Sequence, residues 1–183
     1  MSNTIPKLLY KNEISKRLND IRHGYGVLTR RGVIYGLIAI DQDAKIIAVD
    51  ERFDRKLNYW DLSSIGAALY GVSRQGQDFF DANSLERATV IYDNMKLIVK
   101  SIGDVHLDEK GKREILIVLL TAKEVNLGVI LLQLKKNAEK MRKLIKDSGS
   151  IKETLKMNER EFKKQVNELK KSIFGKTIAV TED

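Results

Sequence analysis

The sequence predicts a mixed α/β (α+β) fold: a three-layer α/β/α sandwich around a five-stranded, mainly antiparallel sheet, followed by a C-terminal helical extension. Three observations predict it. Periodic segments follow one another in the order helix, two strands, helix, three strands, helix. The strands are joined mostly by short turns, so neighbours run antiparallel. Several strands are apolar at both odd and even positions, so both of their faces should be buried, which requires helices on both faces of the sheet.

Length and composition set the outer limits. A chain of 183 residues fits one domain with an appendage. It contains no cysteine, which excludes disulfides, thiolate zinc sites and thiol catalysis. The sequence contains no run of 18 apolar residues, so we expect no segment that spans a membrane. Residues 1–13 lack the apolar core of a secretory signal. We therefore expect a cytoplasmic protein whose contact with a membrane is at most peripheral.

The first helix and the first hairpin come from local signals. Asn12 is a helix cap, Ile14, Leu18 and Ile21 form one apolar stripe, and Gly24 is expected just past the helix end. Residues 33–40 and 45–50 then read as two strands joined by a polar turn.

The later strands and helices follow in the same way. Residues 60–74 are expected to be helical, 85–93 and 96–103 to form a second hairpin, 104–112 a polar loop, and 113–121 the central strand. A long amphipathic helix begins near Asn126. The sequence Asp147-Ser148-Gly149 ends it, and Ser150 with Glu153 is expected to form a capping box for another helix, which Asn158 interrupts and Gly175 ends. A short strand is expected in 176–183.

The helix at 60–74 has an unusual composition, because no charge occurs from Leu62 to Ser73. Projected at about 100° per residue, one side presents an apolar stripe that we expect to face the core. That stripe consists of Leu62, Ile65, Ala68, Leu69 and Val72. The opposite side carries Trp60, Ser64 and the small-residue row Ser63, Ala67 and Gly71.

A soluble helix without a polar face is normally buried all round. It is either the central helix of one domain or a helix covered by a second copy of the chain. The second interpretation is favoured, because few elements remain to cover it and the strand at 85–93 reads as an open sheet edge. The expected dimer interface comprises Trp60, Ser63, Ser64, Ala67, Tyr70, Gly71, Leu85, Arg87, Ala88, Thr89, Val90 and Tyr92.

Three stretches together resemble the roadblock family of dynein-light-chain-like proteins, particularly its small prokaryotic members. They are DLSSIGAALYGVS (61–73), LERATVIY with KLIVKSIG (85–103), and REILIVLLTAKEVNLGVILLQLKKNAEKM (113–141). The resemblance covers about residues 11–146 and implies a roadblock-like domain at 1–146 with an amphipathic helical extension at 147–183. It also implies dimerisation through the central helix and the following strand. It further implies a non-enzymatic adaptor or regulator that binds Ras-like small GTPases.

No constellation for catalysis, metal or cofactor binding stands out. His23 and His106 lack ligand spacing and are expected at the surface. Asp41-Gln42-Asp43 lacks the rest of a calcium loop, and Gly24-Tyr25-Gly26 is too short for a dinucleotide fingerprint. The GKT at 175–177 has Lys170 where a phosphate loop needs glycine. We therefore expect neither an enzyme nor a cofactor.

Charge leaves an alternative open. Residues 1–134 hold 19 basic and 17 acidic side chains, whereas 135–183 hold 14 and 8. The basic C-terminal third could meet nucleic acid, acidic lipid or an acidic protein, but the solvated face of a long helix is the favoured interpretation. Phe162 and Phe174 are its only aromatic residues, which disfavours base stacking. A small-molecule sensor is a third hypothesis, with no polar cluster to support it. The extension presents a candidate partner-binding stripe of Ile151, Leu155, Phe162, Val166, Leu169 and Ile173.

Overall fold

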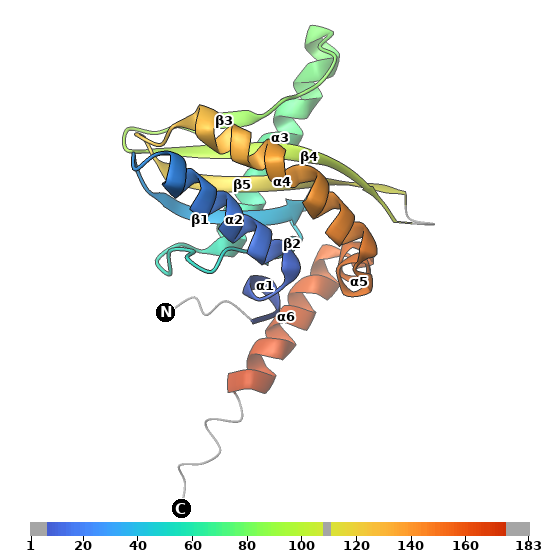
Figure 1. The fold of residues 1–183 in the computed structure, drawn as a ribbon. Helices are drawn as coiled ribbons and strands as arrows, with labels where there is room; N and C mark the ends of the chain where they lie inside the picture. The colour runs from blue at the N-terminus through green and yellow to red at the C-terminus, as the bar shows by residue number, and fades with distance from the viewer. Residues whose placement is uncertain (1–6, 108–110, 175–183) are drawn as a thin grey trace, which may run out of the picture.

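The computed structural model describes residues 7–107 and 111–174, and Figure 1 shows their arrangement. The helices are α1 (Lys7–Tyr10), α2 (Glu13–Leu28), α3 (Tyr59–Phe80), α4 (Leu127–Asp147), α5 (Gly149–Lys156) and α6 (Glu159–Phe174). The strands are β1 (Ile34–Asp41), β2 (Ile46–Val49), β3 (Ala88–Ile91), β4 (Met95–His106) and β5 (Lys112–Ala122). The short strand predicted in 176–183 lies outside the described residues.

The five strands form one antiparallel sheet in the order β2-β1-β5-β4-β3. This confirms the predicted fold class and the central place of β5. The polar loop predicted at 104–112 is shorter than expected, because strand pairing continues through Asp104↔Glu114 to His106↔Lys112. Charged side chains fit such a two-stranded arm, since its backbone is paired while its side chains can remain in water.

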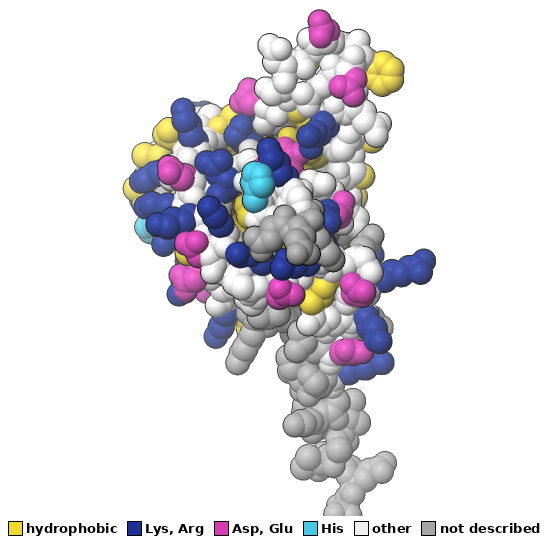
Figure 2. Space-filling model, turned by 90° about the vertical axis from the view of Figure 1, so that its right-hand side faces the viewer, with side chains coloured by type: hydrophobic (Ala, Val, Ile, Leu, Met, Phe, Trp, Pro, Cys, Tyr) yellow, Lys and Arg dark blue, Asp and Glu magenta, His cyan; other side chains and the backbone are white. Residues whose placement is uncertain are grey.

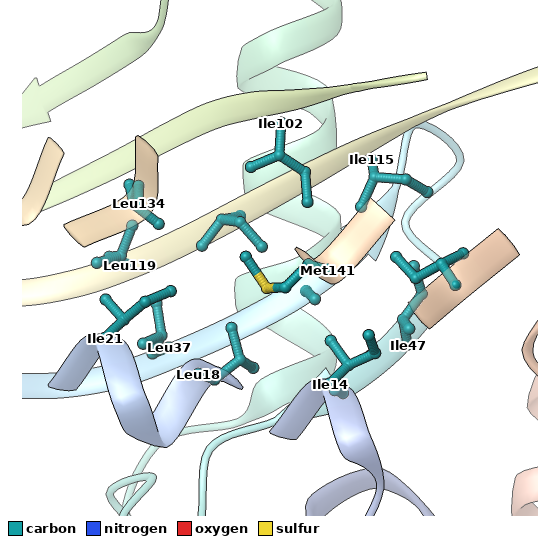
Figure 3. Packing of buried hydrophobic residues seen from close by; sticks show 14 of the residues in the cluster. Ile14, Leu18, Ile21, Leu37, Ile47, Ile102, Ile115, Leu119, Leu134 and Met141 are labelled. Atoms are coloured by element: carbon teal, nitrogen blue, oxygen red, sulfur yellow. The ribbon is translucent and has the colours of Figure 1, made fainter. Parts of the chain in front are cut away.

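Two apolar cores lie on opposite faces of the sheet. In Figure 1, α2 and α4 lie in front of the sheet and α3 lies behind it. The side chains of β5 alternate between the two: Ile117 and Leu119 belong to the α2/α4 core, Leu116 and Val118 to the α3 core. Figure 3 shows how Leu18 and Met141, among others, fill the first core. Both faces of the sheet are therefore covered, as the apolar strands predicted.

Helix α2 does not end at Gly24, as the sequence suggested, but continues to Leu28 and is capped at Thr29. The reason lies in the neighbouring helix. A Cβ atom on Gly24 would lie 2.2 Å from Oε1 of Gln133 in α4. This glycine therefore allows two helices to pack closely and does not stop the first one.

The C-terminal extension folds as two helices. Ser148 caps α5 by accepting a hydrogen bond from the Ile151 amide, so the capping box predicted at Ser150 is wrong by two positions. Asn158 begins α6: its Oδ1 accepts from the Glu161 amide, and Oε2 of Glu161 accepts from the Asn158 amide. The predicted interruption at Asn158 is thus a reciprocal capping box.

A buried lysine fastens this extension to the domain. Lys45 is only 1% exposed. Its Nζ donates to the carbonyl oxygens of Leu155 (2.5 Å) and Met157 (2.8 Å), and lies 3.2 Å from Oδ2 of Asp41. Beyond that point, Phe162 of α6 is buried with its ring 5.7 Å from that of Trp60 at the start of α3. The extension therefore packs on its own domain.

Candidate interaction surface

Helix α3 is longer than predicted. It begins after Asn58, whose Oδ1 accepts from the amides of Trp60 and Asp61, and it ends at Asp81, where φ is +53°. The additional turns carry Phe79 and Phe80, which are 84% and 82% exposed. In Figure 1 this end of α3 projects beyond the edge of the sheet. The longer helix therefore adds exposed aromatic surface that the helix predicted at 60–74 did not include.

The side of α3 that meets the sheet is only partly the one predicted, because Leu62 and Leu69 of the predicted stripe do pack in the α3 core. The residues of α3 buried in the subunit are Tyr59, Leu62, Ser63, Gly66 and Tyr70. A Cβ atom on Gly66 would lie 2.6 Å from Cγ2 of Val118, so only glycine lets the helix approach the central strand this closely. The predicted core stripe is therefore wrong for Ile65, Ala68 and Val72, which are exposed.

Tyr70 fixes this orientation. The residue is 4% exposed, and its hydroxyl donates to Oε1 of Glu114 at 2.9 Å. Burial, followed by the hydrogen bond to Glu114, raises the pKa of Tyr70 to about 12. The hydroxyl thus stays protonated and keeps donating across the physiological range. Arg74 pairs with the other oxygen of Glu114, so two successive turns of α3 are held to β5.

From Ser64 to Val72 the outward side of α3 is uncharged and open to solvent, with the exposed Asp61 one turn before it on the same side. We define the α3 outer face as Ser64, Ile65, Ala68, Gly71 and Val72, all of which are exposed. Ile65 is 52% exposed and Val72 is 69% exposed. A Cβ atom on Gly71 would meet nothing within 4 Å. Because an apolar patch on a soluble protein usually marks a binding site, this face is the strongest candidate for an interface.

Strand β3 forms one edge of the sheet, as predicted. It pairs with β4 on one side, and among the described residues no strand pairs with its other side. Ile91 and Tyr92 at its end are 63% and 48% exposed. An edge of this kind presents free backbone donors and acceptors to another strand. The α3 outer face and the β3 edge together make up the candidate interaction surface.

The predicted interface residues divide into three groups. Ser64, Gly71, Thr89 and Tyr92 are exposed; Trp60, Ala67, Leu85, Arg87 and Val90 are half-buried; Ser63, Tyr70 and Ala88 are buried in their own subunit. Trp60 is covered in part by Phe162 of the same chain. Six further exposed residues of α3 and β3 were not among the predicted ones: Ile65, Ala68, Val72, Phe79, Phe80 and Ile91. The position of Gly66 between Tyr59 and Tyr70 could have indicated which side of α3 faces the sheet, because all three residues are buried there.

The predicted partner-binding stripe also divides. Leu155 and Phe162 are buried in the two cores of this subunit, and Ile151 packs against the first of them. The side chains of Val166, Leu169 and Ile173 lie outside the described part of the structure. The described half of the stripe therefore attaches the extension to the domain.

No other chemistry is assembled in the described residues. His23 and His106 are exposed, as predicted. Within residues 7–107 and 111–174, no three His, Cys, Asp or Glu side chains come together as metal ligands. A cavity of about 500 Å³ lies where the extension meets α1 and β2, with Ile46, Ile151 and Phe162 in its lining. None of the described helices is both long and apolar enough to traverse a bilayer.

Comparison with known proteins agrees with the architecture. No protein-family model and no curated protein matches the sequence. Among solved structures, the Roadblock/LC7 domain from Streptomyces avermitilis matches with a TM-score of 0.58 at 14% identity, covering 73% of this chain and 98% of that one. Gliding protein MglB from Thermus thermophilus matches with a TM-score of 0.57 at 14% identity, covering 79% and 100%. Myxococcus xanthus MglB matches at 0.52 and 12%, covering 73% and 91%. The chain therefore has the roadblock/LC7 fold.

Proposed function

We propose that this chain, a subunit with the roadblock/LC7 fold, forms a homodimer that binds a Ras-like small GTPase and scaffolds or regulates it without catalysing a reaction itself. The observation that carries the proposal is the α3 outer face, which is uncharged and exposed in one subunit. Leaving Ile65 and Val72 in water is unfavourable by about 1.5–3 kcal/mol for each fully exposed side chain. A second copy of the same face removes both from solvent.

A two-fold axis gives this dimer a simple geometry. In an isologous interface the same patch serves on both subunits. Small residues at Ala68 and Gly71 let two α3 helices approach closely. The same axis brings two β3 edges together, which would join both sheets into one and satisfy their free backbone groups. The interface we propose therefore combines the α3 outer face with β3.

We propose a GTPase partner because the sequence resembles the roadblock family, and the fold supports that resemblance. Roadblock domains are known for binding Ras-like GTPases as dimers. The division into a binding domain at 1–146 and an extension at 147–183 belongs to the same proposal. The contacts of Lys45 and Phe162 support it, because they attach the extension beside the start of α3 without covering the α3 outer face.

Arginine at Gly71 should separate the subunits. The Gly71→Arg side chain would point into open space within one subunit, so folding is preserved, but it would place a charge between two α3 helices. Light scattering should give a dimer for the native chain and a monomer for the variant. Gly26→Arg is the matched control, because Gly26 is also a helical glycine with nothing within 4 Å of its Cβ position. A native chain that is monomeric at all concentrations would contradict the dimer.

The second half of the proposal is tested with GTPases from the same genome. Each Ras-like GTPase is loaded with GDP or a non-hydrolysable GTP analogue and mixed with the native dimer, with the Gly71→Arg variant and with the Gly26→Arg control. We expect a complex with the native chain and the control, weakened at least tenfold for the Gly71→Arg variant. Nucleotide turnover in the same mixtures distinguishes activation from tethering. If no GTPase binds the native dimer, the adaptor role is lost while the dimer stands.

A further inference from the structure

Helix α4 carries a band of cations on the side away from the sheet. It holds six basic residues against two acidic ones, Glu139 and Asp147. We define the α4 basic face as Lys135, Lys136, Lys140, Arg142, Lys143 and Lys146, all of which are exposed. At about 100° per residue they fall within an arc of about 160°. Figure 2 shows Lys and Arg side chains gathered on this side of the molecule.

Glu139 and Asp147 lie in the same arc and offset two of these six charges, which leaves a net charge of +4 on this side of α4. No carboxylate of the described residues pairs with any member of the α4 basic face. The neighbouring helix α2 is different, because Lys16, Arg17 and Arg22 pair with Glu13, Asp20 and Asp50. A net excess of unpaired positive charge creates a local positive potential that attracts a polyanion. The basic face is thus a feature of α4 and does not extend over the whole helical layer.

The composition of the face indicates what kind of polyanion it suits. Five of the six cations are lysines, which act as point charges and do not require the planar geometry that arginine recognises. Helix α4 contains no aromatic residue on which a nucleic-acid base could stack. The one large apolar side chain exposed among the cations is Leu132, at 58%. A band of lysines with an exposed leucine is typical of a surface that rests on lipid headgroups.

The arrangement of the layers points the same way. Helices α2 and α4 share one face of the sheet, and α3 occupies the other. If two sheets join through β3, as in the proposed dimer, both α4 helices lie on the same side of the joined sheet. They also lie near the axis, because α4 packs on β4, the neighbour of β3. Two parallel basic bands on one side complement an extended, negatively charged surface.

We propose that the α4 basic face binds an anionic phospholipid bilayer. The inference rests on the proposed dimer only for the doubling of the bands; the six cations belong to each subunit. Bound in this way, the protein turns α1, α6 and the outer end of α3 away from the lipid. The attraction depends on the surface charge of the bilayer and weakens as salt shortens the range of electrostatic interactions.

Co-sedimentation with vesicles tests the proposal. The native chain is mixed with vesicles of phosphatidylcholine alone, or of phosphatidylcholine with phosphatidylglycerol. The test variant carries Lys136→Glu, Lys140→Glu and Lys143→Glu. The matched control carries Arg52→Glu, Arg55→Glu and Lys56→Glu, three exposed changes in the loop before α3. Each triple variant lowers the net charge by six, from +8 to +2, so a difference between them reports position and not total charge.

The native chain should bind only the anionic vesicles and release at high salt. The α4 triple variant should lose affinity by about a hundredfold or more, from roughly fivefold per cation removed. The control should lose much less. Circular dichroism and light scattering establish that all three proteins keep the same fold and mass. If the native chain is a monomer and still binds vesicles through α4, the proposed dimer is refuted and the lipid contact is not.

Three results would overturn the proposal. The first is a native chain that stays in solution with anionic vesicles at low salt. The second is equal loss of binding in both triple variants. The third is binding of a labelled DNA duplex through the same three lysines without binding to vesicles, which would assign the α4 basic face to nucleic acid.

Discussion

Replacing Lys45 with methionine is expected to lower the free energy of unfolding by about 3–5 kcal/mol and to detach the C-terminal extension from the domain. Lys45 joins Asp41, Leu155 and Met157, and both members of the ion pair are essentially inaccessible, at 1% and 0%. Methionine fills a similar volume. It would leave a buried carboxylate without its countercharge and two carbonyl oxygens without their donor, which is the costly way to break a buried pair.

The Lys45→Met variant should also acquire a characteristic pH dependence. Burial raises the pKa of Asp41, and Lys45 is the main influence that lowers it. Without Lys45 the folded-state pKa rises further above the unfolded value of about 3.9. A raised pKa favours folding below the unfolded pKa, and that contribution is lost as pH rises through the folded pKa. The variant should therefore become less stable relative to the native chain as pH rises from about 4 towards neutrality.

Urea unfolding at several pH values measures this effect, and hydrogen exchange of the α5 and α6 amides measures detachment. Lys16→Met is the control, because Lys16 pairs with Glu13 at 60% exposure, and such a pair contributes about 0–1 kcal/mol. Adding Asp41→Asn to Lys45→Met should recover part of the lost stability. A Lys45→Met protein with the native unfolding midpoint and unchanged exchange in α5 would contradict the assigned role of Lys45.

Replacing Arg22 with methionine should produce a loss of similar size, about 3–5 kcal/mol, within the α2/α4 side of the domain. Arg22 lies 2.9 Å from one oxygen of the fully buried Asp50 and donates to the other at 3.0 Å. It also donates to the Ile34 carbonyl. Asp50 further accepts from the amides of Leu37 and Arg52. Arg22 thus ties α2 to both strands of the first hairpin.

The Arg22 prediction differs from the Lys45 prediction in where the damage occurs. Exchange protection should fall in α2 and β1, while the packing of Phe162 on Trp60 remains. Arg17→Met on the same helix is the control, since Arg17 and its partner Asp20 are 32% and 53% exposed. Burial raises the pKa of Asp50 against the influence of Arg22, so this variant too should be relatively more stable in acid. Equal effects of the Arg17 and Arg22 changes would contradict the role assigned to Arg22.

The proposed dimer and the proposed lipid contact use opposite sides of the molecule, so they are testable separately. Gly71 lies on the α3 outer face, and Lys136, Lys140 and Lys143 lie on α4 across the sheet. A change on one side does not touch residues of the other. Additive behaviour of Gly71→Arg and the α4 triple variant on unfolding is therefore expected.

The order of helices and strands was predictable, because it depends on local periodicity. An apolar run such as 113–121 is typical of a strand buried on both faces, and its position as β5 in the middle of the sheet confirmed that interpretation. Asn126 was recognisable as a helix cap because its side chain serves backbone groups only three residues away. Apolar periodicity and helix caps depend only on residues close in sequence, so the fold of the rest of the chain does not alter the element that they predict.

Glycine was the residue whose meaning the sequence left open. Gly24 looked like a helix stop, yet it lies inside α2 where Gln133 of another helix passes. Glycine inside a helix usually destabilises it, yet Gly66 of α3 is where the helix lies close to Val118. Gly71, five residues later, has open space beside it. Gly24 and Gly66 thus permit close packing whereas Gly71 borders open space, and the difference is decided by what lies opposite each glycine.

The sequence by itself determined that one helix would lack a charged side, that the strand after it would be a sheet edge, and that the C-terminal third would be basic. These are properties of composition and spacing, which are present before folding. Only the tertiary structure decided which side of α3 meets the sheet, that Lys45 holds the extension, and that the cations of α4 remain unpaired. Each of these depends on contacts between residues distant in the chain, such as Gly66 with Val118 and Lys45 with Leu155. A helix without charge from Leu62 to Ser73 offers no polar side there to indicate its orientation in advance.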